Sequence, residues 1–277
     1  MIRALLFSLF LVNIPASAQT KIAVIDAGFD SKYKNKVKLC KTGHWSFDDK
    51  PFKDPTQHGT HVVGLIHKYA KKKNYCVVML RYYADENPGS LNLKNMVLAL
   101  KRARRMGVEV VNISGGGPTP SVAEKNVIQS LLDDGVKIVA AAGNEKEILN
   151  EKTCNYYPAC YDSRIIVVGN IAKTSNRGPV VDYWVRANDV RSLNGRMGGT
   201  SQAAAIITGK IVGGISLSDN EADSDIEDEL NRLSVSMPTL VFPNLFRLPS
   251  MPPKYKPSVS HPGRCKSRCT RRKVKNH

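Results

Sequence analysis

Short apolar segments alternate with longer amphipathic segments along most of the chain, and this alternation constrains the fold more than any other feature. The apolar segments have the length and the Val and Ile content of buried strands, whereas the segments between them carry apolar residues at helical spacing. We expect strands at 21–26, 75–80, 108–114, 136–143 and 164–169. We expect helices at 60–73, 91–107, 121–135, 201–216 and 223–234. Strands that alternate with helices predict a mostly parallel sheet covered by helices on both faces.

The chain is organised around one large domain, with a different kind of segment at each end. Residues 1–18 carry a basic residue, Arg3, near the start, continue with an apolar run and end in Ala-Ser-Ala, which is typical of a secretory signal peptide. The apolar run is shorter than the roughly 20 residues that span a bilayer, and we expect no transmembrane segment elsewhere. Cleavage after Ala18 predicts a secreted or periplasmic protein. Residues 19–242 are long enough for a single three-layer α/β domain, and residues 243–277 form a Pro-rich, basic tail that contains cysteines.

Six cysteines in a chain that is expected to be exported favour disulfide bonds. Closeness in sequence favours the pairs 40–76, 154–160 and 265–269, although six cysteines allow fifteen pairings. For the last pair the alternative is a zinc site that also uses His261 and His277, but the loose spacing favours a disulfide.

The positive charge of the chain predicts an anionic partner. The formal net charge is +17, and nine Lys or Arg residues with no acidic residue lie between Met251 and His277. We expect this tail, 251–277, to bind an anionic surface such as lipopolysaccharide, cell wall or nucleic acid. An alternative is that this anion binding is the main function of the protein. We expect a monomer.

Four residues of complementary chemistry follow predicted strands or stand at the start of predicted helices. In an open α/β sheet, active groups gather at the carboxyl ends of the strands. Asp26 ends one expected strand, Asn144 follows another, and His58 and Ser201 stand at helix starts. An imidazole can accept the proton of a serine hydroxyl, a carboxylate can orient the imidazole, and an amide can donate to an oxyanion. We therefore expect Ser201 as nucleophile, His58 as general base, Asp26 as its orienting group and Asn144 in the oxyanion hole.

The same histidine also permits a different interpretation, a metal site. His58 and His61 are three residues apart and would share one face of a helix. However, no glutamate stands between them and no third ligand is evident, so we expect neither a metal nor another cofactor.

Several sequence motifs resemble those of the subtilisin-type serine peptidases, the subtilase (S8) family. The motifs of the catalytic aspartate, histidine and serine are matched by "VIDAG" (24–28), "HGTHVVG" (58–64) and "GTSQAA" (199–204). The substrate-binding strand and the oxyanion segment of the family are matched by "ISGGG" (113–117) and "AAAGNE" (140–145). The resemblance covers about residues 21–234. It implies a subtilisin-like fold and hydrolysis of peptide bonds through an acyl-enzyme.

The resemblance also implies how a polypeptide substrate binds. Ser114, Gly115 and Gly116 would form an edge that pairs with the substrate backbone. Glu145 stands beside Asn144, where its charge would favour a basic side chain at P1, the residue on the acyl side of the cleaved bond. The alternative is a catalytically silent binding protein of the same fold, but all four catalytic groups are present.

Two departures from the family concern the segments around the catalytic motifs. Asp26 lies eight residues after the expected cleavage site, so we expect no N-terminal propeptide. The segment "KYAKKKNY" (68–75) has no carboxylate where the family often has a calcium-binding loop. Because Ca²⁺ prefers carboxylate and carbonyl oxygens, this segment is a poor calcium site.

Overall fold

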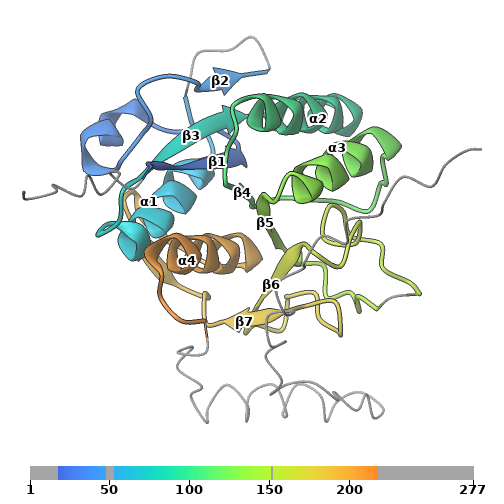
Figure 1. Ribbon diagram of the computed structural model, residues 1–277. Helices are drawn as coiled ribbons and strands as arrows, with labels where there is room; N and C mark the ends of the chain where they lie inside the picture. Colours follow the sequence, from blue (N-terminus) through green and yellow to red (C-terminus); the bar gives the residue numbers. More distant parts are fainter. Residues whose placement is uncertain (1–17, 48–52, 151, 218–277) are drawn as a thin grey trace, which may run out of the picture. The chain divides into compact units, whose positions relative to one another are not determined.

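A parallel sheet of seven strands forms the centre of the protein, as the computed structural model of residues 18–47, 53–150 and 152–217 shows (Figure 1). The strand order is β2-β3-β1-β4-β5-β6-β7, and each neighbouring pair is parallel. The strands are β1 (Thr20–Asp26), β2 (Trp45–Ser46), β3 (Tyr75–Arg81), β4 (Val110–Ile113), β5 (Lys137–Ala141), β6 (Ile166–Asn170) and β7 (Tyr183–Val185). The predicted mostly parallel sheet is confirmed.

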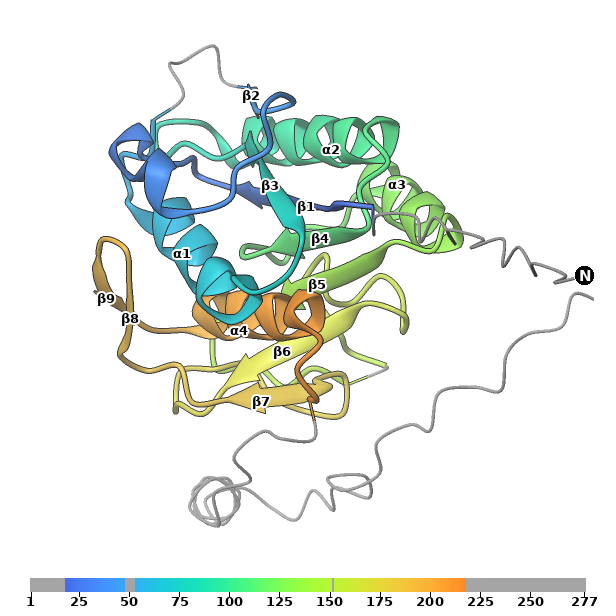
Figure 2. The same ribbon diagram turned by 60° about the vertical axis from the view of Figure 1, so that its left-hand side comes forward.

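Helices cover both faces of this sheet (Figures 1 and 2). Helices α1 (His58–Ala70) and α4 (Thr200–Gly213) pack on one face, and α2 (Gly89–Arg105) and α3 (Val122–Asp133) pack on the other. A short 3₁₀ helix, η1 (Ser31–Lys36), and a hairpin formed by β8 (Val190–Ser192) and β9 (Gly195–Met197) lie outside the sheet. The three layers agree with the predicted fold class.

Two hydrophobic cores lie between the layers, because successive side chains of a strand point to opposite faces. In β1, Ile22 and Val24 pack with α1 and α4, whereas Ala23 and Ile25 pack with α2 and α3. All four side chains are fully buried. Full burial of an aliphatic side chain of Val or Ile size contributes roughly 1.5–3 kcal/mol, so β1 is stabilised from both sides.

Small residues allow α1 and α4 to approach each other closely. Ala203, Ala204 and Ala205 are fully buried in α4. A methyl group added to Gly209 would lie 2.8 Å from the carbonyl oxygen of Ile66 in α1, so only glycine fits at this position. The small-residue run after Ser201 therefore serves the packing of the helix that carries this serine.

Most predicted elements are present, with shifted ends. The predicted strands correspond to β1, β3, β4, β5 and β6, and the first four predicted helices correspond to α1 to α4. Helix α4 ends at Gly213 rather than at the predicted Ser216, because Gly214 adopts a left-handed conformation with φ of 64°. The helix predicted at 223–234, residues 1–17 of the predicted signal peptide and the predicted tail 243–277 lie outside the described residues.

Two of the three predicted disulfides are confirmed. Cys40 is bonded to Cys76 in β3, and Cys154 is bonded to Cys160 in the segment between β5 and β6. The pair 265–269 lies outside the described residues. Disulfides form in oxidising compartments, so these two are consistent with an extracellular location. Within the described ranges, we find no helix whose length and apolar character would let it cross a membrane.

Candidate active site

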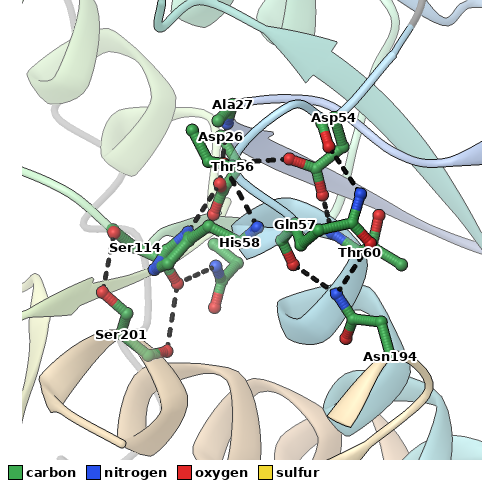
Figure 3. A network of polar contacts seen from close by, with 11 residues as sticks. Asp26, Ala27, Asp54, Thr56, Gln57, His58, Thr60, Ser114, Asn194 and Ser201 are labelled. Carbon is green, nitrogen blue, oxygen red and sulfur yellow. Dashed lines mark hydrogen bonds and ion pairs between the residues drawn. The ribbon is translucent and has the colours of Figure 1, made fainter. Parts of the chain in front are cut away.

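Asp26 and His58 form a hydrogen-bonded pair at the carboxyl end of β1 (Figure 3). Asp26 is the last residue of β1 and His58 is the first residue of α1. The Nδ1 atom of His58 lies 2.7 Å from Oδ1 of Asp26, which also accepts a hydrogen bond from the backbone N–H of Ala27 at 2.6 Å. Because an ionised carboxylate only accepts, Nδ1 carries the proton, and Nε2 of the neutral imidazole is left as a base.

The surroundings of this pair favour a positive charge on the imidazole. The side chain of Asp26 is 3% exposed and that of His58 is 30% exposed. The negative charge of Asp26 raises the pKa of His58 above its ordinary value, and burial of the ring partly opposes this effect. The pair can therefore hold a proton that is transferred to His58 during a reaction.

A second buried carboxylate, that of Asp54, holds the start of α1. Its Oδ2 accepts from the backbone N–H of Thr60 at 2.7 Å, and its Oδ1 accepts from the hydroxyl of Thr56 at 3.0 Å. The Thr56 hydroxyl in turn accepts from the backbone N–H of His58 at 3.2 Å. Burial raises the pKa of Asp54, and its charge contributes to the raised pKa of His58. Asp54 thus positions the backbone that carries His58.

The β8–β9 hairpin fixes α1 from the other side. Asn194 at the tip of the hairpin donates to the carbonyl oxygen of Gln57 at 2.6 Å, and Ser192 donates to that of His61 at 2.7 Å. The Nε2 atom of His61 lies 3.1 Å from the carbonyl oxygen of Val190. His61 is completely buried, so it acts as a structural residue that joins α1 to the hairpin.

Ser201 lies in the first turn of α4 and is bonded to Ser114, which directly follows β4. The Ser201 hydroxyl donates to the carbonyl oxygen of Ser114 at 2.9 Å, and the Ser114 hydroxyl donates to that of Ser201 at 3.1 Å (Figure 3). Within the described part of the chain, no hydrogen bond joins Ser201 to His58. Rotation about the Cα–Cβ bond of Ser201 to another staggered position would free its hydroxyl.

Asn144 follows β5 and contacts the beginning of α4. Its Oδ1 accepts from the backbone N–H of Thr200 at 3.1 Å, and the Thr200 hydroxyl accepts from the backbone N–H of Gly143 at 3.1 Å. With Oδ1 bound in this way, the Nδ2 group of Asn144 is a donor that lies near Gly199, at the N-terminus of α4. The N-terminus of α4 adds a partial positive charge at the same place.

A pocket of about 290 Å³ opens beside the imidazole of His58. Its lining includes Asp26, His58, Tyr82, Ser114, Gly116 and Tyr156. Gly115 also contributes to the wall, so all three residues of the predicted substrate edge line this pocket. Burial raises the pKa of Tyr82 and of Tyr156, so both phenols are neutral near pH 7.

Glu145 directly follows Asn144, and its side chain is held by a buried amide. Asn176, which is completely buried, donates to Oε2 of Glu145 at 2.7 Å and accepts from the backbone N–H of Glu145 at 2.9 Å. The carboxylate of Glu145 thus has a fixed partner inside the protein. Its charge also adds to the effect of burial on the pKa of Tyr156.

Within the described ranges, no group of three or more His, Cys, Asp or Glu side chains is arranged to hold a metal ion. The two histidines that could have formed a metal pair have other partners. His58 is bonded to Asp26, and His61 contacts the carbonyl oxygen of Val190.

The structure brings most of the predicted site residues together in pairs. Asp26 meets His58, Ser201 meets Ser114, and Asn144 meets the start of α4, but His58 and Ser201 are not bonded to each other. Sequence reasoning missed three further residues of this region, which are Asp54, Tyr156 and Asn176. For Asp54 a signal existed, because "DPTQH" places an acid and a threonine just before a predicted helix.

Comparison with known proteins places this geometry in a family. The model of the subtilase family matches residues 17–232. Subtilisin of Bacillus pumilus is 29% identical over 215 residues, which are 69% of this chain and 75% of that protein. Subtilisin E of Bacillus subtilis (strain 168) is 31% identical over 214 residues, which are 69% of this chain. The chain spans about half the length of Subtilisin E, at 54%.

Solved structures support the same assignment. A cold adapted subtilisin-like serine proteinase is similar with a TM-score of 0.56 and 25% identity, over 73% of this chain and 76% of the other. A lanthipeptide protease has a TM-score of 0.61 at 22% identity, over 70% and 72% of the two chains, which shows a shared fold. The family match and the subtilisin relatives give the enzyme class. The chain belongs to the subtilase family of subtilisin-like serine endopeptidases.

Proposed function

We propose that this protein is a secreted endopeptidase that hydrolyses polypeptides through Asp26, His58 and Ser201, with Asn144 in the oxyanion hole. One observation carries the proposal, namely the hydrogen bond between Asp26 and His58 at the carboxyl end of β1. This pair shares a pocket with Ser114, which is bonded to Ser201. The arrangement supplies an oriented base near a serine at a helix N-terminus, as a serine nucleophile requires.

The reaction begins when the Ser201 hydroxyl leaves the carbonyl oxygen of Ser114 and turns toward Nε2 of His58. Its oxygen attacks the carbonyl carbon of the peptide bond, and its proton passes to Nε2. The charge of Asp26 stabilises the resulting imidazolium. When the C–N bond breaks, His58 returns the proton to the leaving amine, and an acyl group remains on Ser201. Water then attacks this ester by the same proton transfers, which releases the acid and restores the serine.

The oxyanion of each tetrahedral intermediate would accept hydrogen bonds from Nδ2 of Asn144 and from the backbone N–H of Ser201. The bond from Thr200 to Oδ1 of Asn144 supports this role, because it orients the amide before a substrate arrives. Loss of one such donor removes roughly 2.7–4 kcal/mol of transition-state stabilisation. The N-terminus of α4 favours the same negative charge.

The substrate backbone would pair with Ser114, Gly115 and Gly116 as an added strand. This edge lines the pocket beside His58. Because two of the three residues are glycines, Ser114 is the one residue of this edge that carries a side chain of its own. Glu145 would border the same substrate site, with its carboxylate held by Asn176.

Two further proposals concern the cellular setting. Export by the signal peptide 1–18 agrees with the disulfides of the described domain. We further infer that the protein acts as a monomer and that the tail 251–277 binds an anionic surface, which would determine where the enzyme works. The tail lies outside the described residues, and its charge carries this proposal.

A fluorophosphonate probe tests the catalytic assignment, because it reacts with an activated serine. We expect the folded protein to be labelled at Ser201 and to hydrolyse an unfolded protein substrate. Ser201→Ala should abolish both, and Ser130→Ala in α3 is the matched control, because Ser130 donates only to a carbonyl of its own helix. A folded protein that is not labelled would instead support the silent binding protein.

A further inference from the structure

We propose that Tyr156 is a specificity-determining residue that restricts P1 of the substrate to glycine, alanine and other small side chains. This inference rests on the proposed function, because it needs a peptide that acylates Ser201. The ring of Tyr156 occupies the space between two chain segments that flank the catalytic groups. One segment is 114–117 after β4, which contains the edge of Ser114, Gly115 and Gly116, and the other is 142–145 after β5.

The catalytic groups determine where the P1 side chain must go. The P1 carbonyl carbon bonds to Ser201, and its oxygen points toward Asn144. The P1 backbone follows the edge at Gly115 and Gly116. Its side chain therefore enters the space between the segment after β4 and the segment after β5, which are neighbouring parallel strands.

The Tyr156 ring already spans this space. A methyl group added to Gly116 would lie 2.7 Å from Cε1 of the ring, and one added to Gly143 would lie 2.7 Å from Cε2. The two ring edges thus touch opposite walls. The backbone of Gly143 has φ of 100°, a conformation that favours glycine, so the wall itself is adapted to the ring.

The backbone around Tyr156 is held so that the ring cannot be withdrawn with its loop. The disulfide between Cys154 and Cys160 encloses the residue, and the backbone N–H of Cys160 donates to the carbonyl oxygen of Tyr156 at 3.0 Å. The next residue, Tyr157, exchanges two backbone hydrogen bonds with Gly117, at 2.8 and 2.9 Å. Tyr156 is 7% exposed and belongs to the hydrophobic core on the face of the sheet that α2 and α3 cover.

This arrangement disagrees with the expectation that the charge of Glu145 favours a basic side chain at P1. A Lys or Arg side chain would have to pass the Tyr156 ring to reach that carboxylate. The carboxylate is also bonded to the Asn176 amide already. An aromatic or long aliphatic P1 side chain meets the same obstruction, since overpacking a filled site is unfavourable.

The test uses the full-length protein and peptide substrates that differ only at P1, which is Ala, Leu, Phe or Lys. We expect kcat/KM for Ala to exceed that for Phe and Lys by at least about a hundredfold, the discrimination that a close-fitting pocket provides. Tyr156→Ala should raise kcat/KM for Leu and Phe and remove most of this preference. Tyr156→Phe is the matched control, because it keeps the ring and should keep the preference for Ala.

The outcomes separate this inference from the proposed function. If the parent protein is labelled by a fluorophosphonate at Ser201 yet cleaves Phe or Lys peptides as well as Ala peptides, Tyr156 does not restrict P1. If Tyr156→Ala folds and keeps the preference of the parent, another residue restricts P1. If the folded parent is not labelled, the proposed function fails first, and this inference fails with it.

Discussion

At the scale of single residues, the protonation of His58 is set by two opposing effects. The charge of Asp26 favours the imidazolium and raises the pKa of His58, whereas burial disfavours the charge. Asp54 acts in the same direction as Asp26. Because the raising effects prevail, the neutral imidazole, which is the form that would accept the Ser201 proton in the proposed reaction, predominates only above the ordinary pKa of 6.5.

The Asp26→Asn substitution tests this balance. In the parent, kcat/KM should rise with pH and reach half its maximum above pH 6.5, where the imidazolium of His58 loses its proton. Without the Asp26 charge the pKa of His58 falls, so the midpoint should move to lower pH. The maximal rate should drop by about four orders of magnitude, because an amide no longer holds the required tautomer.

A pH profile of kcat/KM for both proteins measures this effect. Lys21→Gln in the same strand is a control that changes a charge at the opposite end of β1. A midpoint that stays in place in Asp26→Asn would show that another group controls the profile.

The residues of the site differ in how far sequence could predict them. Asp26, His58, Asn144 and Ser201 each stand at a strand end or a helix start, and they could be selected as candidates because their chemical groups complement one another in combination. The bond between the Ser201 hydroxyl and Ser114 could not be predicted, because it depends on a side-chain rotation. Tyr156 could not be selected either, since its position depends on contacts with Gly116 and Gly143, which are distant in sequence.

At the scale of elements, the start of α1 depends on a carboxylate outside the helix. The residue before the helix, Gln57, has φ of 60° and provides no side-chain cap. Asp54 caps the helix instead, because its side chain accepts a hydrogen bond from the backbone N–H of Thr60, which is a fully buried residue. His58 is the first residue of this helix, so the cap also fixes the position of the base.

Substitutions of Asp54 should separate its structural role from its electrostatic role. Asp54→Ala leaves the buried N–H of Thr60 without an acceptor and should lower the free energy of unfolding by about 1–2 kcal/mol. Asp54→Asn keeps one acceptor oxygen and should cost less. Both remove the charge that helps to raise the pKa of His58, so both should move the pH midpoint of kcat/KM downward.

Urea unfolding and pH profiles of the two variants give the two readouts. Equal stability losses in Ala and Asn variants would mean that the cap on Thr60 is unimportant. An unchanged pH midpoint in both variants would mean that the charge of Asp54 does not affect the pKa of His58.

The elements themselves were predictable where they are long and regular. β1, β3 and β5 are apolar runs buried on both faces, and α2 has a continuous amphipathic pattern. The edge strands β2 and β7 have only two and three residues, which is too short for a periodic pattern. Their existence depends on pairing with β3 and β6, and a single stretch of sequence does not contain that information.

At the scale of the whole molecule, the charge of the tail should affect location rather than catalysis. Nine of the basic residues behind the net charge of +17 lie in 251–277, outside the residues that form the site. A protein that lacks 251–277 should keep the parent kcat/KM for a peptide substrate and should bind weakly to vesicles of anionic lipid. Binding of the parent should decrease steeply as salt increases.

A variant in which the nine Lys and Arg residues are replaced by Gln is the control for chain length. Like the deletion, it should keep the parent kcat/KM and bind weakly to vesicles of anionic lipid. If the deletion abolishes peptide hydrolysis, or if parent binding does not depend on salt, the proposed division of roles is wrong.

The two described disulfides should differ in how much they stabilise the protein and in whether they affect P1 specificity. The bond Cys40–Cys76 closes a loop with a sequence separation of 36, and Cys154–Cys160 closes one of 6. The loss of chain entropy in the unfolded state predicts stabilisation of about 4 kcal/mol for the longer loop and about 2 kcal/mol for the shorter one. Cys40→Ala with Cys76→Ala should therefore lower the free energy of unfolding more than Cys154→Ala with Cys160→Ala.

Only the second pair of substitutions should weaken the preference for Ala at P1, because only the disulfide between Cys154 and Cys160 encloses Tyr156. Urea unfolding and the P1 peptide series measure the two effects, and a change of P1 preference in the first pair of substitutions would contradict this division.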